Sequence, residues 1–372
     1  MIDTVCLSIP ERNIILMDEN NNMIPNWNLY SRTEHYTKHV RNPSKSEKDT
    51  GLYFPRITAY SRKYQPEQQI KIEFSAPKLL FLNNLDELAD KDFDQVIDTL
   101  QDRLRRMGVT IFKKYLIEAP VTSVHYSRNI MLSGGQTSTN ILSQIGRIDL
   151  RKSFDFARAR YINDGQSLCC HTSSHELVFY DKIADLNKGK KRAIDRDRTA
   201  YQTSLFDELK NRNDAREVLR MEVRLSKKQK MNSVFRQLKL TQNPCFKDIF
   251  SSKISNEVLM TYWNNIVKSK NLASFMLELS PIELLKRISA NKPSTKPKQL
   301  IFLTGIILMA QSSNGLRELR EVICKKADTR TWSRLICEYR SISEIVSAGR
   351  LRNWVKDLEY QINNYKPLRI NK

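Results

Sequence analysis

Residues 167–183, SLCCHTSSHELVFYDKI, decide the fold of the first half of the chain. Two short, mostly apolar runs in this stretch flank a Thr-Ser-Ser segment, which is the pattern of a β-hairpin. A third run, VLRMEVRL at residues 218–225, alternates apolar with charged side chains, as a strand with one buried face does. Together the three runs predict an antiparallel sheet with one apolar and one polar face.

The rest of the chain extends this pattern and then changes. The same signals predict strands at 1–9, 70–75 and 121–132 and helices at 92–107 and 139–148. Residues 20–63 are polar and are expected to include long loops, whereas beyond Lys227 the apolar spacing becomes helical. The predicted class is therefore α+β: an antiparallel-sheet domain with helices on one face at 1–230, then a mostly helical domain at 231–372.

The charge points to a polyanionic partner. The 372 residues carry a formal net charge of +21, and such a surplus repels itself unless a polyanion binds it. The opening MIDTVCLSIPER lacks the features of a signal peptide, and the apolar stretch 300–310 is too short for a bilayer, which needs about 20 residues. We therefore expect DNA or RNA as the partner, no membrane, and a location in the cytoplasm. The six cysteines form no CxxC pair and are expected to be reduced thiols.

Three pieces of the strand-rich half resemble a known family. They are the opening MIDTVCLSIP, the segment HELVFYDKIADL with its Tyr-x-Lys, and LRMEVRL further along. Their order and spacing are similar to the catalytic region of the replication-associated endonucleases of filamentous phages, the gene II and gene X type proteins. The segment TRTWSRLICEYRSISEI, at 329–345, is similar to the smaller C-terminal region of that family. The resemblance covers most of the chain and implies a rolling-circle replication initiator with an antiparallel-sheet nuclease domain. By the same resemblance to phage proteins, the cytoplasm would be that of a bacterial host cell.

The resemblance implies that Tyr180 is the nucleophile. Residues two apart on a strand share a face, so Glu176, Val178, Tyr180 and Lys182 are expected to point the same way. A phenol with a pKa of about 10 is a poor nucleophile at pH 7, and a neighbouring ammonium favours the phenolate. Lys182 is also suited to meet the charge that develops on the scissile phosphate.

The resemblance also implies a divalent metal beside the tyrosine. Many rolling-circle nucleases hold it with two histidines two residues apart, and this chain has no such pair. His125 lies in the strand expected at the centre of the sheet, and Glu73 and Glu222 lie on strands expected beside it. One imidazole and two carboxylates suit Mg²⁺ or Mn²⁺, so these three residues are the predicted ligands.

Each predicted ligand also has a structural interpretation. Glu222 lies between Arg220 and Arg224 on one face and can simply pair with them. His125 can be a hydrogen-bonded core histidine, and Glu73 a surface acid.

Two rival metal sites rank lower. Asp149 resembles an Arg-Ile-Asp ligand of some relatives, but here it closes a helical pattern. Cys169, Cys170, His171 and His175 suggest zinc, although structural zinc sites usually show more widely spaced pairs.

A basic segment follows the hairpin and is expected to track the DNA backbone. Its residues are Lys188, Lys190, Lys191, Arg192, Arg196 and Arg198. The Gly-Gly-Gln-Thr at 134–137 lacks the Lys-Ser/Thr ending of a phosphate-binding loop, so we expect no nucleotide cofactor. Strand separation would then depend on a host helicase, and extension of the new end on a host polymerase.

The predicted activity is site-specific nicking and rejoining of one strand of supercoiled or single-stranded origin DNA, through a 5′-phosphotyrosine bond. Two alternatives stay open: a DNA-binding regulator without catalysis, and a conjugative relaxase that uses the same chemistry. A second tyrosine, Tyr126 or Tyr161, is a candidate for the termination step.

Overall fold

The structure is a computed structural model, and it describes residues 1–16, 28–63, 67–133, 135–148, 160–162, 166–187, 217–268, 272–312, 315–349 and 351–369. The strands are β1 (Ile2–Pro10), β2 (Ile15–Leu16), β3 (Asn28–Thr33), β4 (Tyr36–Arg41), β5 (Arg56–Arg62), β6 (Gln69–Ser75), β7 (Val109–Thr110), β8 (Val121–Met131), β9 (Arg160–Ile162), β10 (Ser167–His171), β11 (His175–Asp181) and β12 (Val218–Leu225). The helices are α1 (Lys45–Asp49), α2 (Ala76–Phe81), α3 (Phe93–Arg106), α4 (Lys113–Ile117), α5 (Ser138–Gly146), α6 (Lys182–Asn187), α8 (Lys228–Gln237), α9 (Phe246–Ile249), α10 (Ser252–Tyr262), α11 (Pro281–Asn291), α12 (Pro297–Gln311), α13 (Gly315–Lys326), α14 (Thr329–Ser347) and α15 (Asn353–Asn363).

Ten of the described strands form one sheet in the order β3-β4-β5-β6-β1-β8-β12-β11-β10-β9. All of its pairings are antiparallel. The predicted hairpin is β10 and β11, in which Cys169 lies opposite Val178. The strand that holds His125, β8, lies inside the sheet between β1 and β12, as predicted. The antiparallel sheet, the mixed α and β class and the helical C-terminal region are therefore confirmed.

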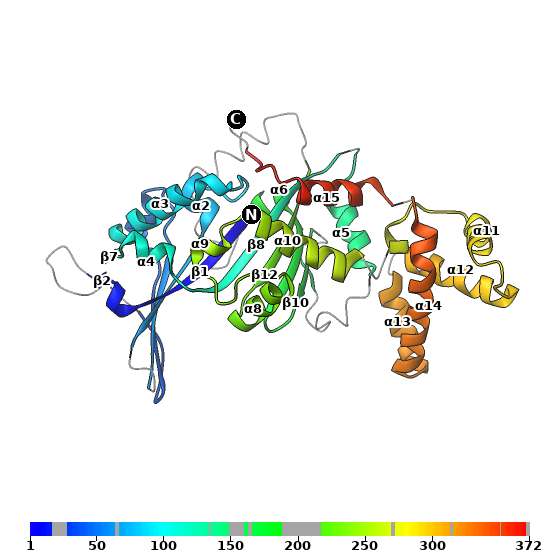
Figure 1. Ribbon diagram of the computed structural model, residues 1–372, viewed down its shortest axis with the longest axis horizontal. Helices are drawn as coiled ribbons and strands as arrows, with labels where there is room; N and C mark the ends of the chain where they lie inside the picture. Colours follow the sequence, from blue (N-terminus) through cyan, green and yellow to red (C-terminus); the bar gives the residue numbers. More distant parts are fainter. Residues whose placement is uncertain are drawn as a thin grey trace.

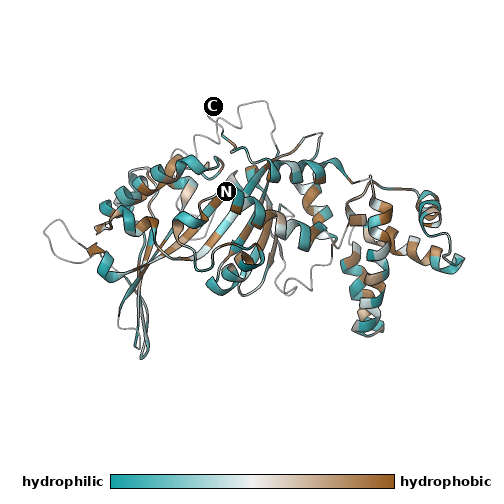
Figure 2. Ribbon diagram, in the orientation of Figure 1, coloured by the Kyte–Doolittle hydropathy of each residue, from teal (hydrophilic) through white to brown (hydrophobic). Residues whose placement is uncertain are grey.

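Hydrophilic and hydrophobic residues alternate along the central strands of the sheet (Figure 2), so its two faces differ in polarity. One face joins the main hydrophobic core, to which β12 contributes Leu219, Met221 and Val223. Helices α3, α5, α8 and α10 pack onto this face through buried residues such as Leu100 and Leu259. Successive side chains on a strand alternate between the two faces of the sheet. The polar residues that alternate with these apolar ones in β8, β11 and β12 therefore lie on the opposite face.

The sequence predicts α3 closely, since its apolar residues recur at helical spacing. Val96, Ile97, Leu100 and Leu104 are all buried on one side of the helix. Gly108, just after the helix, has a φ of +79°, a left-handed conformation that glycine adopts without strain.

The region 20–63, expected to include long loops, also holds strands that the sequence pattern did not predict. This part of the chain holds β3, β4 and β5, which extend away from the rest of the sheet (Figure 1, lower left). Nearly all side chains of β3 are exposed, so no alternation of apolar and polar residues marks it as a strand. Backbone pairing between neighbouring strands, which the sequence pattern does not reveal, fixes this arm.

The described residues form two main hydrophobic cores that do not divide at residue 230. Residues beyond the sheet, including Met231, Leu259 and Trp354, pack in the same core as the strands. Helix α15 returns to the sheet domain, where Trp354 Nε1 donates to Gln144 Oε1 over 2.9 Å. The second core lies among α11–α14, around buried Trp332. Residue 230 thus lies where the strands end and the helical half begins, but it does not separate two hydrophobic cores.

The apolar stretch 300–310, which is too short for a bilayer, forms most of α12. Leu303, Ile306 and Ile307 are buried in the second core, whereas Ile301 is 66% exposed. Among the described residues, no single helix is long and apolar enough to cross a membrane; α12 and α13 meet that test only as a pair bent by 119°.

Candidate functional site

Tyr180 lies in a polar cluster on the face of the sheet opposite the main core. Its hydroxyl donates to Glu222 Oε1 over 2.6 Å. The contact is diagonal, because Tyr180 of β11 lies opposite Arg220 of β12 and Glu222 lies opposite Val178. The predicted nucleophile and one predicted metal ligand are therefore direct neighbours.

Arg220 is the centre of the cluster, and its side chain is 1% exposed. Its Nε donates to Glu222 Oε1 over 2.8 Å, and its Nη2 donates to Asp3 Oδ1 over 2.6 Å. The remaining bonds run to Asn84 O, Asn129 Oδ1 and Ser127 Oγ over 2.8, 3.0 and 2.8 Å. An arginine has five N–H groups, so every donor of this buried guanidinium has an acceptor.

Arg224 holds the other side of the Glu222 carboxylate. Its Nε and Nη2 donate to Glu222 Oε2 over 2.9 and 2.7 Å, and its Nη1 donates to Glu176 Oε2 over 3.1 Å. Its side chain is 32% exposed, so this end of the cluster meets solvent. Glu222 therefore bridges a fully buried and a partly exposed arginine.

The cluster shifts the pKa values of the phenol and the carboxyl in opposite directions. Burial, reinforced by the Glu222 charge, raises the pKa of Tyr180 well above its usual value, although Arg220 opposes the shift. Burial also acts to raise the pKa of Glu222, but Arg224 and Arg220 more than offset it and hold that pKa well below its usual range. In the resting site the phenol keeps its proton and the carboxylate keeps its charge.

Lys182 begins α6 instead of continuing β11, yet it stays beside the tyrosine. Its Nζ lies 5.6 Å from the centre of the Tyr180 ring and donates to Asn84 Oδ1 over 2.9 Å. Burial and the nearby Arg220 lower the pKa of Lys182 to about 7. A lysine in this range both holds and releases a proton near neutral pH, which is the property of a general acid.

The structure does not assemble the predicted metal ligands into one site. Glu73 lies on β6, which β1 separates from β8. It lies opposite Arg56 of β5 on one side and Cys6 of β1 on the other. His125 lies opposite Arg224, and its burial together with that guanidinium lowers the pKa of the imidazole. The described residues include no group of three or more His, Cys, Asp or Glu side chains placed to hold a metal ion.

The chemistry of Glu222 explains why these three residues do not fit a dication. Its two oxygens already accept from Tyr180, Arg220 and Arg224. A metal ion at this carboxylate would have to displace an arginine and would be repelled by the one that stays. The pairing interpretation of Glu222 is the one observed, and the need for Mg²⁺ or Mn²⁺ stays a prediction.

The zinc alternative lacks its geometry. Cys169 and His171 lie on the polar face of β10, whereas Cys170 faces the main core. His175 packs edge-on against Tyr262 with ring centroids 5.8 Å apart, and its Nδ1 lies 2.8 Å from Thr172 Oγ1. The four side chains do not converge on one point.

The second-tyrosine candidates are separated from Tyr180 in different ways. Tyr126 lies in the main core, and its hydroxyl donates to Ile249 O over 3.4 Å. It therefore points away from the polar face. The side chain of Tyr161 lies outside the described residues, as do Asp149 and the predicted backbone contacts Lys188, Lys190, Lys191, Arg192, Arg196 and Arg198.

Sequence reasoning missed two members of the cluster, Asp3 and Asn84. Asp3 is 8% exposed and accepts from Arg220, and Asn84 accepts from both Arg220 and Lys182. A charged residue among the apolar residues of the opening strand was the available signal for Asp3. Asn84 lies in a loop after α2, and no local pattern connects it to a strand more than 130 residues away.

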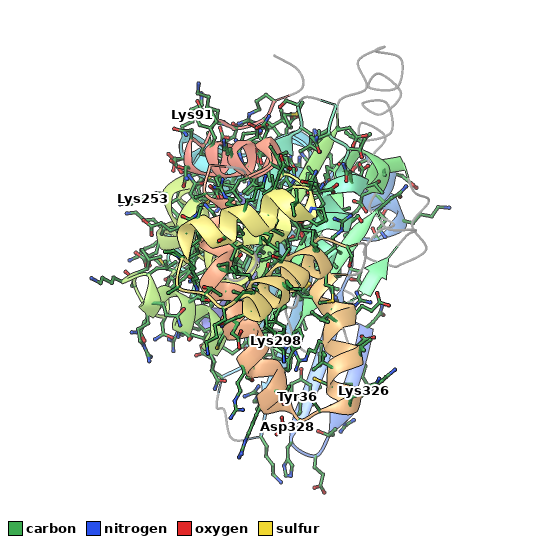
Figure 3. The ribbon with its side chains drawn as sticks, turned by 90° about the vertical axis from the view of Figure 1, so that its right-hand side faces the viewer. Tyr36, Lys91, Lys253, Lys298, Lys326 and Asp328 are labelled. Carbon is green, nitrogen blue, oxygen red and sulfur yellow. The ribbon has the colours of Figure 1, made fainter. Side chains whose placement is uncertain are left out.

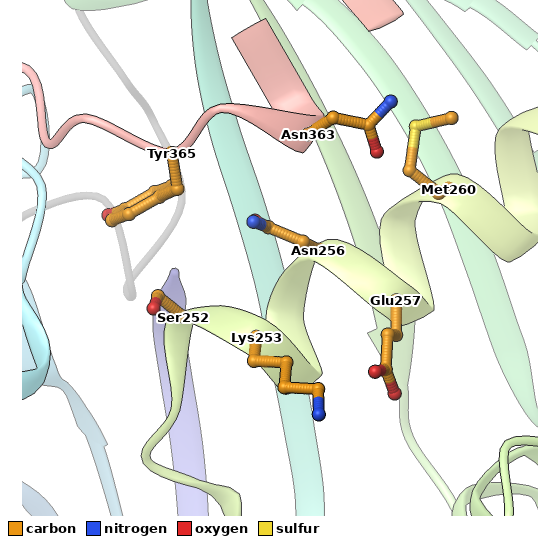
Figure 4. Close-up of a pocket in the computed structure, with 7 residues that line it drawn as sticks. All are labelled: Ser252, Lys253, Asn256, Glu257, Met260, Asn363 and Tyr365. Atoms are coloured by element: carbon orange, nitrogen blue, oxygen red, sulfur yellow. The ribbon is translucent and has the colours of Figure 1, made fainter. Parts of the chain in front are cut away.

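A surface pocket lies elsewhere, between α10, the last residue of α15 and the segment after it. It has a volume of about 460 Å³ and is lined by Ser252, Lys253, Asn256, Glu257, Met260, Asn363 and Tyr365 (Figure 4). No predicted site residue lines it. The polar cluster is thus a packed network rather than an open cavity.

Comparison with known proteins adds no relative. No family model matches the chain, and neither the curated proteins nor the solved structures give a significant match.

Proposed function

We propose that this chain is a rolling-circle replication initiator that nicks one strand of DNA with Tyr180. The observation that carries the proposal is the 2.6 Å hydrogen bond from the Tyr180 hydroxyl to Glu222, inside a cluster that also holds Arg220, Arg224 and Lys182. A phenol, a proton acceptor and three cationic side chains are the groups that a phosphoryl transfer to tyrosine requires. The net charge of +21 supports a nucleic-acid substrate.

The proposed step is a transesterification. The Tyr180 oxygen forms a bond to phosphorus while the bond from phosphorus to the 3′ oxygen breaks. The phenolic proton passes to the Glu222 carboxylate, and Lys182 gives a proton to the departing 3′ oxygen. Arg224, at the exposed edge of the cluster, is positioned to pair with the phosphate charge. The products are a 5′-phosphotyrosine bond and a free 3′-hydroxyl, and reversal of the step rejoins the strand.

Access to the phenol is the condition for this reaction. Tyr180 is 9% exposed, so bound DNA has to open a path to its oxygen. The same burial favours the second candidate function, a DNA-binding protein in which the cluster only holds the sheet together. The two candidates differ in whether a covalent protein–DNA bond forms.

The test uses supercoiled plasmids that carry fragments of the replicon encoding the chain, with Mg²⁺ present. We expect the wild-type chain to yield nicked circles with protein attached to the 5′ end after denaturation. Tyr180→Phe should abolish both products and keep salt-sensitive DNA binding. Tyr126→Phe, which removes a buried hydroxyl on the opposite face, is the matched control and should nick normally.

Two results would reject the proposal. An adduct formed by Tyr180→Phe would exclude this residue as the nucleophile. Binding without any nick or adduct in the wild-type chain would leave the non-catalytic DNA-binding protein as the function.

A further inference from the structure

The arm formed by β3, β4 and β5 exposes aromatic and basic side chains. Leu29 and Tyr30 of β3 are 57% and 67% exposed. Residues 28–41 and 56–63 hold six basic residues and one acidic residue, Glu34. Tyr36 marks the tip of the hairpin at the lower end of the molecule (Figure 3). Ile57 and Ala59 of β5 lie in the main core, but the described strands β3 and β4 contribute no residue to it. The arm therefore offers a cationic surface.

Four side chains on one face of the arm and of the adjoining strand β6 form an aromatic–lysine row: Tyr30, Lys38, Tyr60 and Lys71. Lys38 Nζ lies 4.3 Å from the centre of the Tyr30 ring, and Lys71 Nζ lies 5.1 Å from the centre of the Tyr60 ring. Lys38 lies directly opposite Tyr60 in the pairing of β4 with β5. The row thus alternates ring and cation across four neighbouring strands.

The row lies on the same face of the sheet as the Tyr180 cluster. In the pairing of β6 with β1, Lys71 lies opposite Ser8, and Glu73 lies opposite Cys6. In the pairing of β1 with β8, Cys6 lies opposite Ser123. Side chains two apart on a strand share a face, so His125 continues this face and lies opposite Arg224. One uninterrupted sheet face therefore runs from the arm to the arginine at the exposed edge of the cluster.

We propose that the aromatic–lysine row binds single-stranded DNA and guides it along this face toward Tyr180. Bases stack on exposed tyrosine rings, and lysines between the rings pair with phosphates; this combination is the general means of binding single strands without sequence preference. In a duplex the bases are already stacked on each other, so exposed rings favour an unpaired strand. The direction toward Tyr180 rests on the proposed function, whereas the binding surface does not.

The test measures binding in the Tyr180→Phe background, in which the proposed cleavage cannot occur. The probe is a fluorescein-labelled dT20 oligonucleotide, with fluorescence anisotropy at 50 to 200 mM salt and an unlabelled 20-base-pair duplex as competitor. We expect Tyr30→Ala and Tyr60→Ala each to weaken dT20 binding by roughly 5- to 100-fold, the contribution of one base–aromatic stack. Tyr30→Phe and Tyr60→Phe keep the ring and should bind within threefold of the parent.

The lysines are tested by the salt dependence of binding. Lys38→Gln with Lys71→Gln should reduce the slope of log affinity against log salt by about 1.4, since each single-strand phosphate contact contributes about 0.7. Tyr360→Ala on α15, where the side chain is 65% exposed, and Lys298→Gln on α12 (Figure 3) are controls outside the arm and should change nothing.

The proposal is overturned if Tyr30→Ala, Tyr60→Ala and the double lysine variant all bind dT20 like the controls, or if they lose duplex and single-strand binding equally. Because the assay needs no cleavage, failure of Tyr180 as a nucleophile leaves this result interpretable. Nicking of supercoiled DNA is measured with the same row variants in a chain that keeps Tyr180. Loss of dT20 binding together with normal nicking would support the surface and reject its role in guiding the strand.

Discussion

The Tyr180 cluster and the aromatic–lysine row lie on one face of one sheet, and both combine tyrosine with cationic side chains. In the cluster, Arg220 is 1% exposed, and five acceptors satisfy its donors. In the row, Tyr30 is 67% exposed and contacts a lysine. Similar side chains therefore have different roles: burial makes the cluster part of the fold, whereas exposure leaves the row able to change partners.

The comparison predicts that the largest loss of stability follows from removing Arg220. Arg220→Met leaves Asp3 and Glu222 buried without their shared counterion. Breaking a buried ion pair in this way costs about 3–5 kcal/mol. Urea denaturation should show this decrease in the free energy of unfolding.

Arg32→Met is the matched control, because Arg32 is an exposed arginine of the arm. Its free energy of unfolding should stay within about 0.5 kcal/mol of wild type. If Arg220→Met and Arg32→Met lowered the free energy of unfolding equally, the cluster would stabilise the fold no more than the arm does.

A smaller loss is expected when the central carboxylate is neutralised. Glu222→Gln keeps the shape of the side chain but removes the charge that Arg220 and Arg224 share, which should cost roughly 1.5–3 kcal/mol, the range for hydrogen bonds to charged groups. Nicking should fall by about 100-fold, because the proton acceptor of Tyr180 is lost.

Glu73→Gln separates this interpretation from the predicted metal site. Glu73 lies on β6, outside the cluster, so both stability and the Mn²⁺ concentration for half-maximal nicking should match wild type. A large increase in that concentration would show that Glu73 binds the metal after all.

A separate effect concerns the pH dependence of stability. The pKa of Lys182 is lowered to about 7 in the folded chain, so the unfolded chain binds more protons between this value and the usual pKa of about 10.4. Stability should therefore rise as pH increases through this window, by at most about 1.4 kcal/mol per pH unit.

Thermal and urea unfolding at pH 7.5 and 9.5 measure this rise. Lys182→Met should flatten it, whereas Lys228→Met, which changes an exposed lysine of α8, should keep it. The same slope in both variants would assign the pH dependence to other groups.

The sequence by itself determined the elements with regular burial. The sequence predicts the hairpin, the strand at 218–225 and the helix at 92–107 because each element buries one face. Burial of one face makes apolar residues recur every two residues in a strand and every 3.6 residues in a helix. The shared face of Tyr180 and Glu176 follows from the same rule. The nicking activity and its metal stay predictions that rest on the resemblance.

Only the tertiary structure decided what the polar residues do. Glu222 was a candidate metal ligand or an arginine partner until the pairing of β11 with β12 placed it between Tyr180, Arg220 and Arg224. Asp3 and Asn84 joined the cluster from distant parts of the chain, and β3 gained its strand from backbone pairing alone. The physical reason is that hydrogen bonds between distant segments leave no period in the sequence, whereas a buried face does.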